Sequence, residues 1–572
     1  MDRRRLVAAA RGDVPGDLLL ANARIVNVFT SEIEQGDVLV AEGHVAGIGA
    51  GYQASDVVDL RGAFLLPGFI SGHTHPESSY LWLPQYASLV VSHGTTTVIT
   101  DLHELVNVSG LAAVGRLLQD VERLPLEIFL MVPSCVPASD LETSGARVLS
   151  SDVADALQWP SVLGLGELMD YGGVIEGSSE CLDKAVVALQ AGKVIDGHAP
   201  GLTGHDLNAY LAAGAGSDHE CTTLPEGRLK LQRGMRLMIR EGTSEENLED
   251  LLPLVTDATY PRCLLVVDDR SCRDLLRHGE LDAVVRKAIR LGLNPIRAIQ
   301  LATINPATYF GLRDHGAIAP GFVANMIVAD DLADLRPRDV YHNGRLVASA
   351  GRCLSDPGSL GGENFSHTVR LNSLSERDFA IPGNGRRMRV IQVVPRQIST
   401  HQVLETVRSE DGYVVADTKR DIIRAAVIER HTGSGNIGVG LVQGFGLQRG
   451  ALASTVAHDS HNLMIVGCDE ADMHAAAQEI QRCGGGLAVV AEGRLLASLP
   501  LPIAGLMSPD SPEHVVSQLD VVEAAARGLG VTIPNPFAVL SFLALSVLPE
   551  LRLTDKGLVD VRAKSLVPLA AD

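Results

Sequence analysis

Two histidines lie one residue apart at the end of an apolar run, in the segment LLPGFISGHTHPESS at residues 65–79. In a β-strand, side chains at positions i and i+2 point to the same side. The imidazoles of His73 and His75 are therefore directed at one point, and Glu77 follows two residues later. Two such rings can bind a metal ion when further nitrogen or oxygen ligands converge on them.

Seven later apolar runs also end in polar residues, and a helical pattern separates each run from the next. The eight runs are FLLPGFISGHTH, GTTTVITDLHE, EIFLMVPSC, VLGLGELMD, KVIDGHAPG, AAGAGSDHE, MRLMIREG and RCLLVVDDR. Strands that alternate with helices imply a parallel sheet, and eight such units imply a (β/α)8 barrel of the TIM type. Continuous apolar runs are typical of strands that are covered on both faces.

In a barrel of this type the active site lies at the carboxyl ends of the strands. The later runs end in Asp101, His103, Glu104, Glu167, His198, Asp218, His219, Glu220, Arg240, Glu241, Asp268 and Asp269. A single histidine at a strand end is more often a hydrogen-bonded side chain than a ligand. The ordered combination differs: His-x-His on the first strand, an acid on the fourth, a histidine on the fifth and sixth, and an aspartate on the eighth. It predicts a divalent-metal site.

The elements outside these runs predict further domains. Hairpin-like segments at 17–62 and 316–350, the second with the turn Asn343-Gly344, predict one composite β domain from residues 1–65 and 316–365. The barrel is expected at 66–315, and an additional α+β domain at 366–572. Within that last domain, EADMHAAAQEIQRC predicts an amphipathic helix, and the segment from Gly484 predicts two strands joined by a turn.

Composition limits the classes of function. The 572-residue chain has a formal net charge of -21, which argues against a nucleic-acid surface. Eight cysteines without a C-x-x-C pair are typical of reduced, cytosolic thiols. The start lacks the apolar core of a signal peptide, and the most apolar segment, 537–548, is too short to span a bilayer. We expect a soluble cytoplasmic protein with a small-molecule substrate, and neither nucleic acid nor membrane as a partner.

Several longer segments resemble the adenine deaminase family of the amidohydrolase superfamily. They include PGFISGHTHPESS, DLHELVNVSG, LGELMDYGGVI, DGHAPGLTGHDLNAYLAAGAGSDHE and, near the end, HDSHNLMIVG and LPLPIAGLMS. The resemblance covers nearly the whole chain, including the last domain, which most amidohydrolases lack. It implies a barrel flanked by a β-sandwich, and a homo-oligomer, expected to be a dimer.

The resemblance also implies a two-metal centre. His73 and His75 would bind one ion and His198 and His219 the other, with Glu167 as a bridge and Asp268 at the first ion. Mn²⁺ or Fe²⁺ is expected, with Zn²⁺ as an alternative, because mixed nitrogen and oxygen ligation is compatible with each.

The implied reaction is the conversion of adenine to hypoxanthine and ammonia, a step of purine salvage. Two cations lower the pKa of a shared water, and the resulting hydroxide attacks C6 of adenine. Asp268 is the expected proton shuttle, and Glu104, beside His103, is a candidate proton donor to the ring. We further expect Glu77, Asp101, Arg240 and Asp269 at the substrate.

Other interpretations stay open. The substrate could be another 6-substituted purine or a cyclic amide, although cyclic-amide hydrolases usually carry a lysine where Glu167 stands. A catalytically silent scaffold is disfavoured by the intact ligand set, and the H-x-E…P-C-x-x-C signature of zinc nucleobase deaminases is absent. The two histidines of HDSHN at 458–462 are expected at a domain or subunit contact rather than a metal site, because we expect no further ligands to cluster near them.

Overall fold

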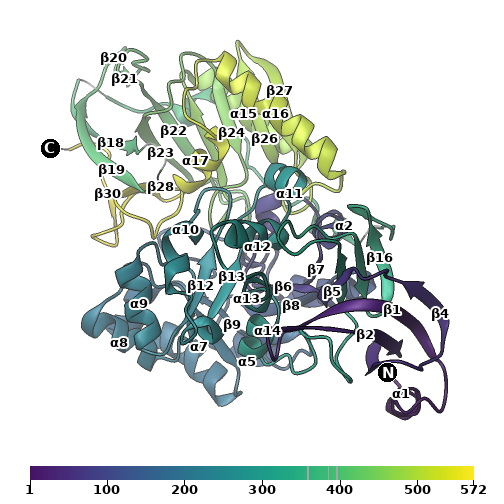
Figure 1. Cartoon of the computed structure of the whole chain (residues 1–572). Helices are drawn as coiled ribbons and strands as arrows, with labels where there is room; N and C mark the ends of the chain where they lie inside the picture. The colour runs from purple at the N-terminus through teal and green to yellow at the C-terminus, as the bar shows by residue number, and fades with distance from the viewer. Residues whose placement is uncertain (357, 359, 384, 395–396, 398, 572) are drawn as a thin grey trace.

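The computed structural model describes residues 1–571 except 357, 359, 384, 395, 396 and 398. Figure 1 shows an amino-terminal sheet at one side, a central region of strands and helices, and a carboxy-terminal region stacked on the central one. Within the described residues, no helix is long and apolar enough to cross a membrane.

The amino-terminal segment and a later segment share one sheet. Its order is β17-β16-β15-β14-β5-β1-β2-β3, with β4 added beside β1. Its strands are β1 (Gly16–Asn27), β2 (Glu32–Ala41), β3 (His44–Ile48), β4 (Ala54–Asp59), β5 (Phe64–Pro67), β14 (Met326–Ala329), β15 (Asp339–His342), β16 (Arg345–Ser349) and β17 (Arg352–Cys353). Asn343 and Gly344 both have positive φ in the β15–β16 turn, as a type I′ hairpin requires. The two distant segments thus share a single hydrogen-bonded sheet.

The eight predicted strands of the central region are all present. They are β6 (Phe69–Ser71), β7 (Thr95–Thr100), β8 (Glu127–Val132), β9 (Val162–Leu168), β10 (Val194–Gly197), β11 (Ser217–Asp218), β12 (Arg236–Arg240) and β13 (Cys263–Val266). They form two parallel sheets, β10-β9-β8-β7-β6 and β11-β12-β13, each in chain order. All six residues of β7, TTTVIT, are buried, and β-branched side chains of this kind suit a strand covered on both faces.

Helices connect these strands in the alternating pattern that the sequence predicts. They are α2 (Leu83–Ser92), α3 (His103–Ser109), α4 (Leu111–Asp120), α5 (Ser150–Ala156), α6 (Tyr171–Glu176), α7 (Ser179–Gln190), α8 (Gly204–Ala212), α9 (Leu224–Gln232) and α10 (Leu248–Leu251). After β13 follow α11 (Cys272–His278), α12 (Leu281–Arg290), α13 (Pro295–Leu301) and α14 (Ile304–Phe310).

The first predicted run is divided rather than continuous. Its beginning, β5, pairs with β14 in the amino-terminal sheet, whereas its end, β6, pairs with β7 in the parallel sheet. Gly68 separates the two strands, and a Cβ built on it would lie 2.3 Å from Thr96 Oγ1. The chain therefore changes sheets at a residue that has no room for a side chain, and the parallel strands start at Phe69 rather than at residue 66.

The carboxy-terminal region has an eight-stranded sheet of order β19-β18-β23-β22-β25-β24-β26-β27. Its elements are β18 (Arg387–Val393), β19 (Thr400–Thr406), β22 (Ile422–Ile428), β23 (Ile437–Gln443), β24 (Ala451–Ser454), β25 (Leu463–Gly467), α15 (Glu470–Cys483), β26 (Gly486–Ala491), β27 (Arg494–Pro500), α16 (Pro512–Gly528) and α17 (Pro536–Phe542). Two small sheets accompany it, β20 (Ser409–Glu410) with β21 (Tyr413–Val414), and β28 (Leu551–Thr554) with β29 (Gly557–Asp560) and β30 (Ser565–Val567).

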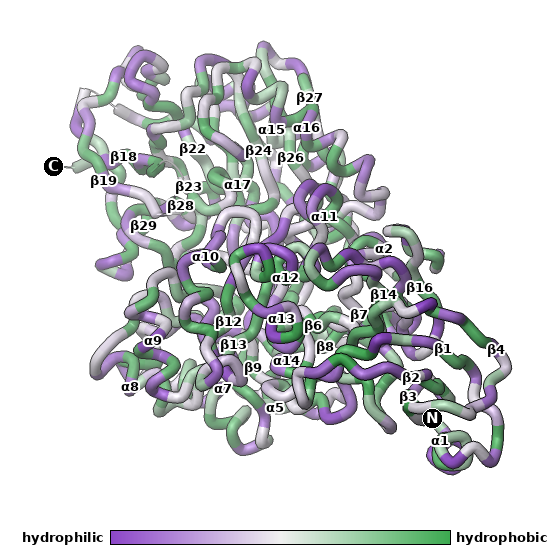
Figure 2. Tube along the Cα trace, viewed as in Figure 1, coloured by the Kyte–Doolittle hydropathy of each residue, from purple (hydrophilic) through white to green (hydrophobic). Residues whose placement is uncertain are grey.

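The predicted helix over EADMHAAAQEIQRC is α15, and local signals set its ends. The Asp469 side chain accepts a hydrogen bond from the Asp472 amide at the start, and Gly484 adopts the left-handed conformation after the last turn. Figure 2 shows hydrophobic residues concentrated along the central strands and hydrophilic residues along the outer helices and loops. Because these strands are buried, the polar residues at their ends are the candidates for a functional site.

Candidate metal centre

Backbone hydrogen bonds hold the His-x-His segment against the end of the last parallel strand. The Asp268 amide donates to the His73 carbonyl at 3.1 Å, and the His75 amide donates to the Asp268 carbonyl at 3.2 Å. Asp268 itself has φ +56°, a conformation that L residues adopt at an energetic cost. The paired segments thus fix three candidate ligands relative to one another.

The first group of candidate ligands converges within contact distance. His75 Nε2 lies 3.1 Å from both Glu167 Oε1 and Asp268 Oδ1. His73 Nε2 lies 3.4 Å and 3.3 Å from the same two oxygens. Four donor atoms, from strands β6, β9 and β13, therefore surround one point.

The second group lies on the other side of Glu167. His198 Nδ1 is 2.9 Å from Glu167 Oε2, and His219 Nε2 is 3.6 Å from that oxygen. Glu167 consequently presents one carboxylate oxygen to each pair of histidines. This is the arrangement that a carboxylate bridging two cations requires.

At His73 the geometry fits metal ligation better than direct hydrogen bonding. His73 Nε2 is buried and has no hydrogen-bond partner among the described residues, although two carboxylate oxygens lie near it. Ligand atoms about 2.1 Å from a shared ion lie roughly 3 to 3.5 Å from one another, which matches the spacing here. Imidazole nitrogens and carboxylate oxygens are suitable donors for a first-row divalent cation.

Electrostatics favour charged forms of the ligands. Burial disfavours the His73 cation, but Asp268 and Glu167 beside it raise the pKa of His73 to about 10. Burial is likewise outweighed at His198, where Glu220 and Glu167 raise the pKa to about 9. The pKa values of Glu167 and Asp268 are held well below their usual range by the histidines, against the effect of burial. Metal binding must therefore displace protons from the imidazoles.

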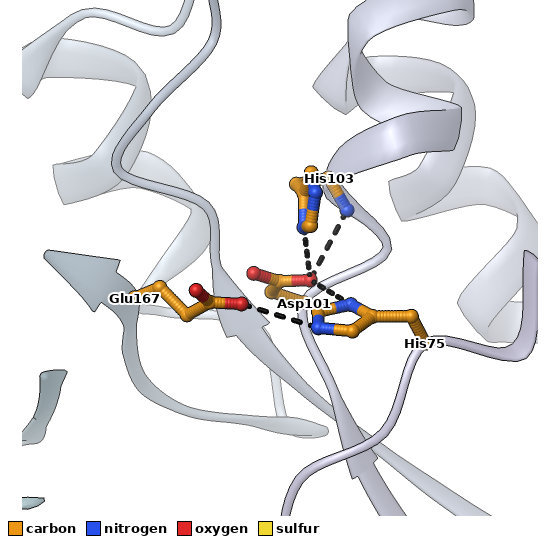
Figure 3. A group of neighbouring side chains, drawn as sticks. All are labelled: His75, Asp101, His103 and Glu167. Carbon is orange, nitrogen blue, oxygen red and sulfur yellow. Dashed lines mark hydrogen bonds and ion pairs between the residues drawn. The ribbon is translucent and has the colours of Figure 1, made fainter. Parts of the chain in front are cut away.

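Asp101 lies behind His75 and links it to His103, as Figure 3 shows. Its Oδ1 is 3.2 Å from His75 Nδ1 and 2.9 Å from His103 Nδ1. Metal-binding histidines usually contact a carboxylate through their second nitrogen, which fixes the orientation of the ring. The position of Asp101 therefore favours a role in orienting His75 over the predicted contact with the substrate.

Arg240 lies beside the ligands and contacts two acids. Its Nη1 is 2.8 Å from Asp268 Oδ2 and 2.5 Å from Glu220 Oε1. Glu220 Oε1 is also 3.4 Å from His219 Nε2. Glu220 was not among the predicted site residues, although its position directly after His219 was a signal that could have identified it.

Three further acids lie beside the cluster. Glu77 is buried, and its Oε1 accepts a hydrogen bond from the Leu105 amide. Burial, together with the nearby charge of Glu104, raises the pKa of Glu77 to about 7. Asp269 accepts a hydrogen bond from Ser78 Oγ. The structure thus brings all the predicted site residues to the carboxyl ends of the parallel strands.

The carboxy-terminal region adds two histidines, His458 and His461, which the sequence predicted at a domain or subunit contact rather than beside the candidate site. His458 Nδ1 is 2.9 Å from Glu104 Oε1, and His461 Nε2 is 3.8 Å from Glu104 Oε2. The expectation that no further ligand-type residue clusters near HDSHN was wrong, because Glu104 comes from a segment more than 350 residues away. The expected domain contact, by contrast, is present at these histidines.

Two family models match the chain: the amidohydrolase family over residues 64–347 and the adenine deaminase C-terminal domain over residues 397–565. A protein named adenine deaminase from Dehalococcoides mccartyi is 53% identical over 564 residues, which cover 99% of this chain and 98% of that protein. One from Desulfatibacillum aliphaticivorans is 48% identical and covers 99% of each chain. One from Methanothrix thermoacetophila is 45% identical, again over 99% of each chain.

Proposed function

The chain belongs to the adenine deaminase family of the amidohydrolases, and we infer from this that it hydrolyses the amino group of adenine to give hypoxanthine and ammonia. It is accordingly a hydrolase of C–N bonds in cyclic amidines. The observation in the structure that carries this inference is Glu167, whose two oxygens face two separate pairs of histidines.

We infer that the eight parallel strands form a closed (β/α)8 barrel. Two seams support this: a parallel bridge joins Thr74 to Asp268, and the Gly216 amide donates to the Ile195 carbonyl. The flanking sheet would correspond to the composite β-sandwich of residues 1–65 and 316–365, and residues 366–572 to the additional α+β domain.

We propose that His73, His75 and Asp268 hold one divalent cation, His198 and His219 a second, and that Glu167 bridges them. Such cations supply a hydroxide nucleophile at neutral pH by lowering the pKa of water. Mn²⁺ or Fe²⁺ is our proposal, with Zn²⁺ as the alternative, because the donor set is mixed nitrogen and oxygen.

The roles of the remaining residues follow from their contacts. Asp268 is the proposed acceptor of the proton from the attacking water and its donor to the leaving ammonia. Arg240 keeps Asp268 oriented through the 2.8 Å contact with Oδ2. Asp101 orients His75. Glu77, whose pKa is raised, is the proposed proton donor to the ring of the substrate. Glu104, beside His103, is the other candidate expected from the family, but His458 lowers its pKa against the effect of burial and favours its carboxylate form. Asp269 would line the approach to the site.

We also propose a cytoplasmic homodimer. All eight cysteines are free thiols, as a reducing compartment requires. The dimer rests on the family resemblance.

The test is ammonia release from adenine by purified protein reconstituted with Mn²⁺, with hypoxanthine identified as the other product. The His75→Ala variant is the control, because it removes a ligand of the first cation. Metal-dependent release that is lost in the variant is expected. No ammonia release from adenine, together with ammonia release from another 6-substituted purine or hydrolysis of a cyclic amide, would contradict the assigned substrate.

A further inference from the structure

A cavity of about 320 Å³ lies between the ends of the parallel strands and the carboxy-terminal region. Ser78, Thr243 and Asp269 line it from the strand ends, and His458, Phe537 and Phe542 line it from the opposite side. Cavities of this size hold small ligands when apolar walls combine with a few polar groups. Asp269, one of its lining residues, directly follows the candidate ligand Asp268.

The carboxy-terminal region is fixed over this end of the strands by several loops. Ser508 forms a parallel bridge to Leu81 and backbone hydrogen bonds to Tyr80 and Trp82. The Thr143 amide donates to Asp555 at 2.8 Å, and Asn462 donates to the Thr143 carbonyl at 2.7 Å. These anchors follow β6 and β8, on loops at the carboxyl ends of the parallel strands. These contacts therefore fix the carboxy-terminal region, and the wall that it forms, relative to the ends of the parallel strands.

His458 is a polar group on that wall that is held by two contacts. Its Nδ1 lies 2.9 Å from Glu104, and its ring stacks on Phe542 with 4.7 Å between the centroids. Its side chain is 12% exposed and lines the cavity. Within the described part of the chain, no hydrogen bond engages Nε2. One ring nitrogen is thus held by the protein, and the other remains available to a ligand.

We propose that the carboxy-terminal region forms one wall of the adenine site and that His458 contacts the purine base through Nε2. The inference rests on the proposed function and adds a substrate contact from outside the parallel strands. A purine has apolar faces that suit the phenylalanines, and ring nitrogens at its edge that hydrogen-bond to an imidazole. Glu104 and Phe542 would hold the imidazole in place before the substrate arrives, which lowers the entropic cost of binding.

Two substitutions separate the contacts of the two ring nitrogens. In His458→Asn the side-chain amide can take the place of Nδ1 and keep the contact with Glu104, but nothing reaches the position of Nε2. In His458→Gln the amide reaches the position of Nε2, and the group at Nδ1 is lost. The exposed histidine of α16, changed as His514→Gln, is the matched control.

The expected result is a loss of kcat/KM for adenine of about 10-fold to 100-fold in His458→Asn, mainly through KM. His458→Gln should lose less, and His514→Gln should match the wild type. Two metal ions per chain and an unchanged thermal melting temperature should accompany all three variants. A ring that only supports Glu104 would give the opposite order, with His458→Asn nearly wild type and His458→Gln impaired.

Either that reversed order or unchanged kinetics in both variants would overturn the proposal. If one variant fails to fold, Phe542→Leu provides the second measurement, and a KM for adenine equal to that of the wild type would again contradict the contact. Failure of the proposed function is distinct, because the wild type and His514→Gln would then both fail to release ammonia from adenine.

Discussion

The metal centre and the wall opposite it are built in different ways. The six candidate ligands lie on strand ends of two parallel sheets, and their donor atoms approach one another to between 2.9 and 3.6 Å. The wall instead belongs to the carboxy-terminal region, where His458 meets Glu104 across a contact between two regions of the chain. Parallel strands bring their ends together by construction, whereas the position of the wall relies on how the regions dock.

This difference predicts different consequences for substitutions in the two regions. A ligand side chain at a strand end contacts several other ligands, so its loss should change the whole cluster. A residue on the wall has few partners, so its loss should affect substrate binding and leave the cluster intact. The following predictions test this division from the largest expected effect to the smallest.

The largest effect is expected for Glu167→Ala, which removes the one group that contacts both halves of the cluster. Loss of metal catalysis costs several kcal/mol of transition-state stabilisation, or about 10³-fold or more in rate. Metal content by elemental analysis, together with ammonia release, measures it. Retention of two ions per chain and of activity would show that Glu167 is no bridge.

The affinity of the metal-free protein for Mn²⁺ should rise steeply with pH. His73 and His198, with pKa values raised to about 10 and about 9, are protonated at neutral pH, and each must lose its proton to become a ligand. The affinity should therefore rise about tenfold per pH unit for each proton displaced, and level off only above these pKa values. Calorimetric titrations at pH 6.5, 7.5 and 8.5 provide the measurement. A pH-independent affinity would contradict the assignment of these ligands.

Asp101→Asn should weaken metal binding by about 10-fold to 100-fold, because Asp101 orients His75 through its second nitrogen. Competition against a chelator of known affinity measures the change. The exposed aspartate changed in Asp257→Asn, which pairs with Arg297 at the surface, is the control. An effect on KM for adenine without an effect on metal affinity would instead favour the substrate contact first predicted for Asp101.

The smallest effect is expected for Asp520→Ala, at the edge of the contact between the regions. Arg273 pairs with Asp520 at 2.7 Å and with Glu523 at 3.0 Å, and the Asp520 side chain is half exposed. Ion pairs of this kind contribute about 1 kcal/mol or less to the free energy of unfolding. Urea unfolding and kcat/KM for adenine should both stay close to wild type. A large loss of activity would mean that this pair, rather than the loops around Ser508 and Thr143, holds the wall.

The same division explains what the sequence could predict. His73, His75, Glu167, His198, His219 and Asp268 follow apolar runs, and a parallel arrangement converts that order into proximity. The ends of α15 were also predictable from the sequence, since Asp469 and Gly484 act locally. The break at Gly68 was not predictable, because it depends on which sheet each half of one apolar run joins. The contact of His458 with Glu104 was not predictable either, because no local pattern encodes how two regions dock.

The central claim is that the protein deaminates adenine with two cations that one glutamate bridges. The most direct measurement is ammonia release from adenine while metal-free protein is titrated with Mn²⁺ and the bound metal is counted. The account predicts that activity reaches its maximum at two ions per chain and falls to background when a chelator removes them. Full activity with one ion per chain, or with none, would contradict it.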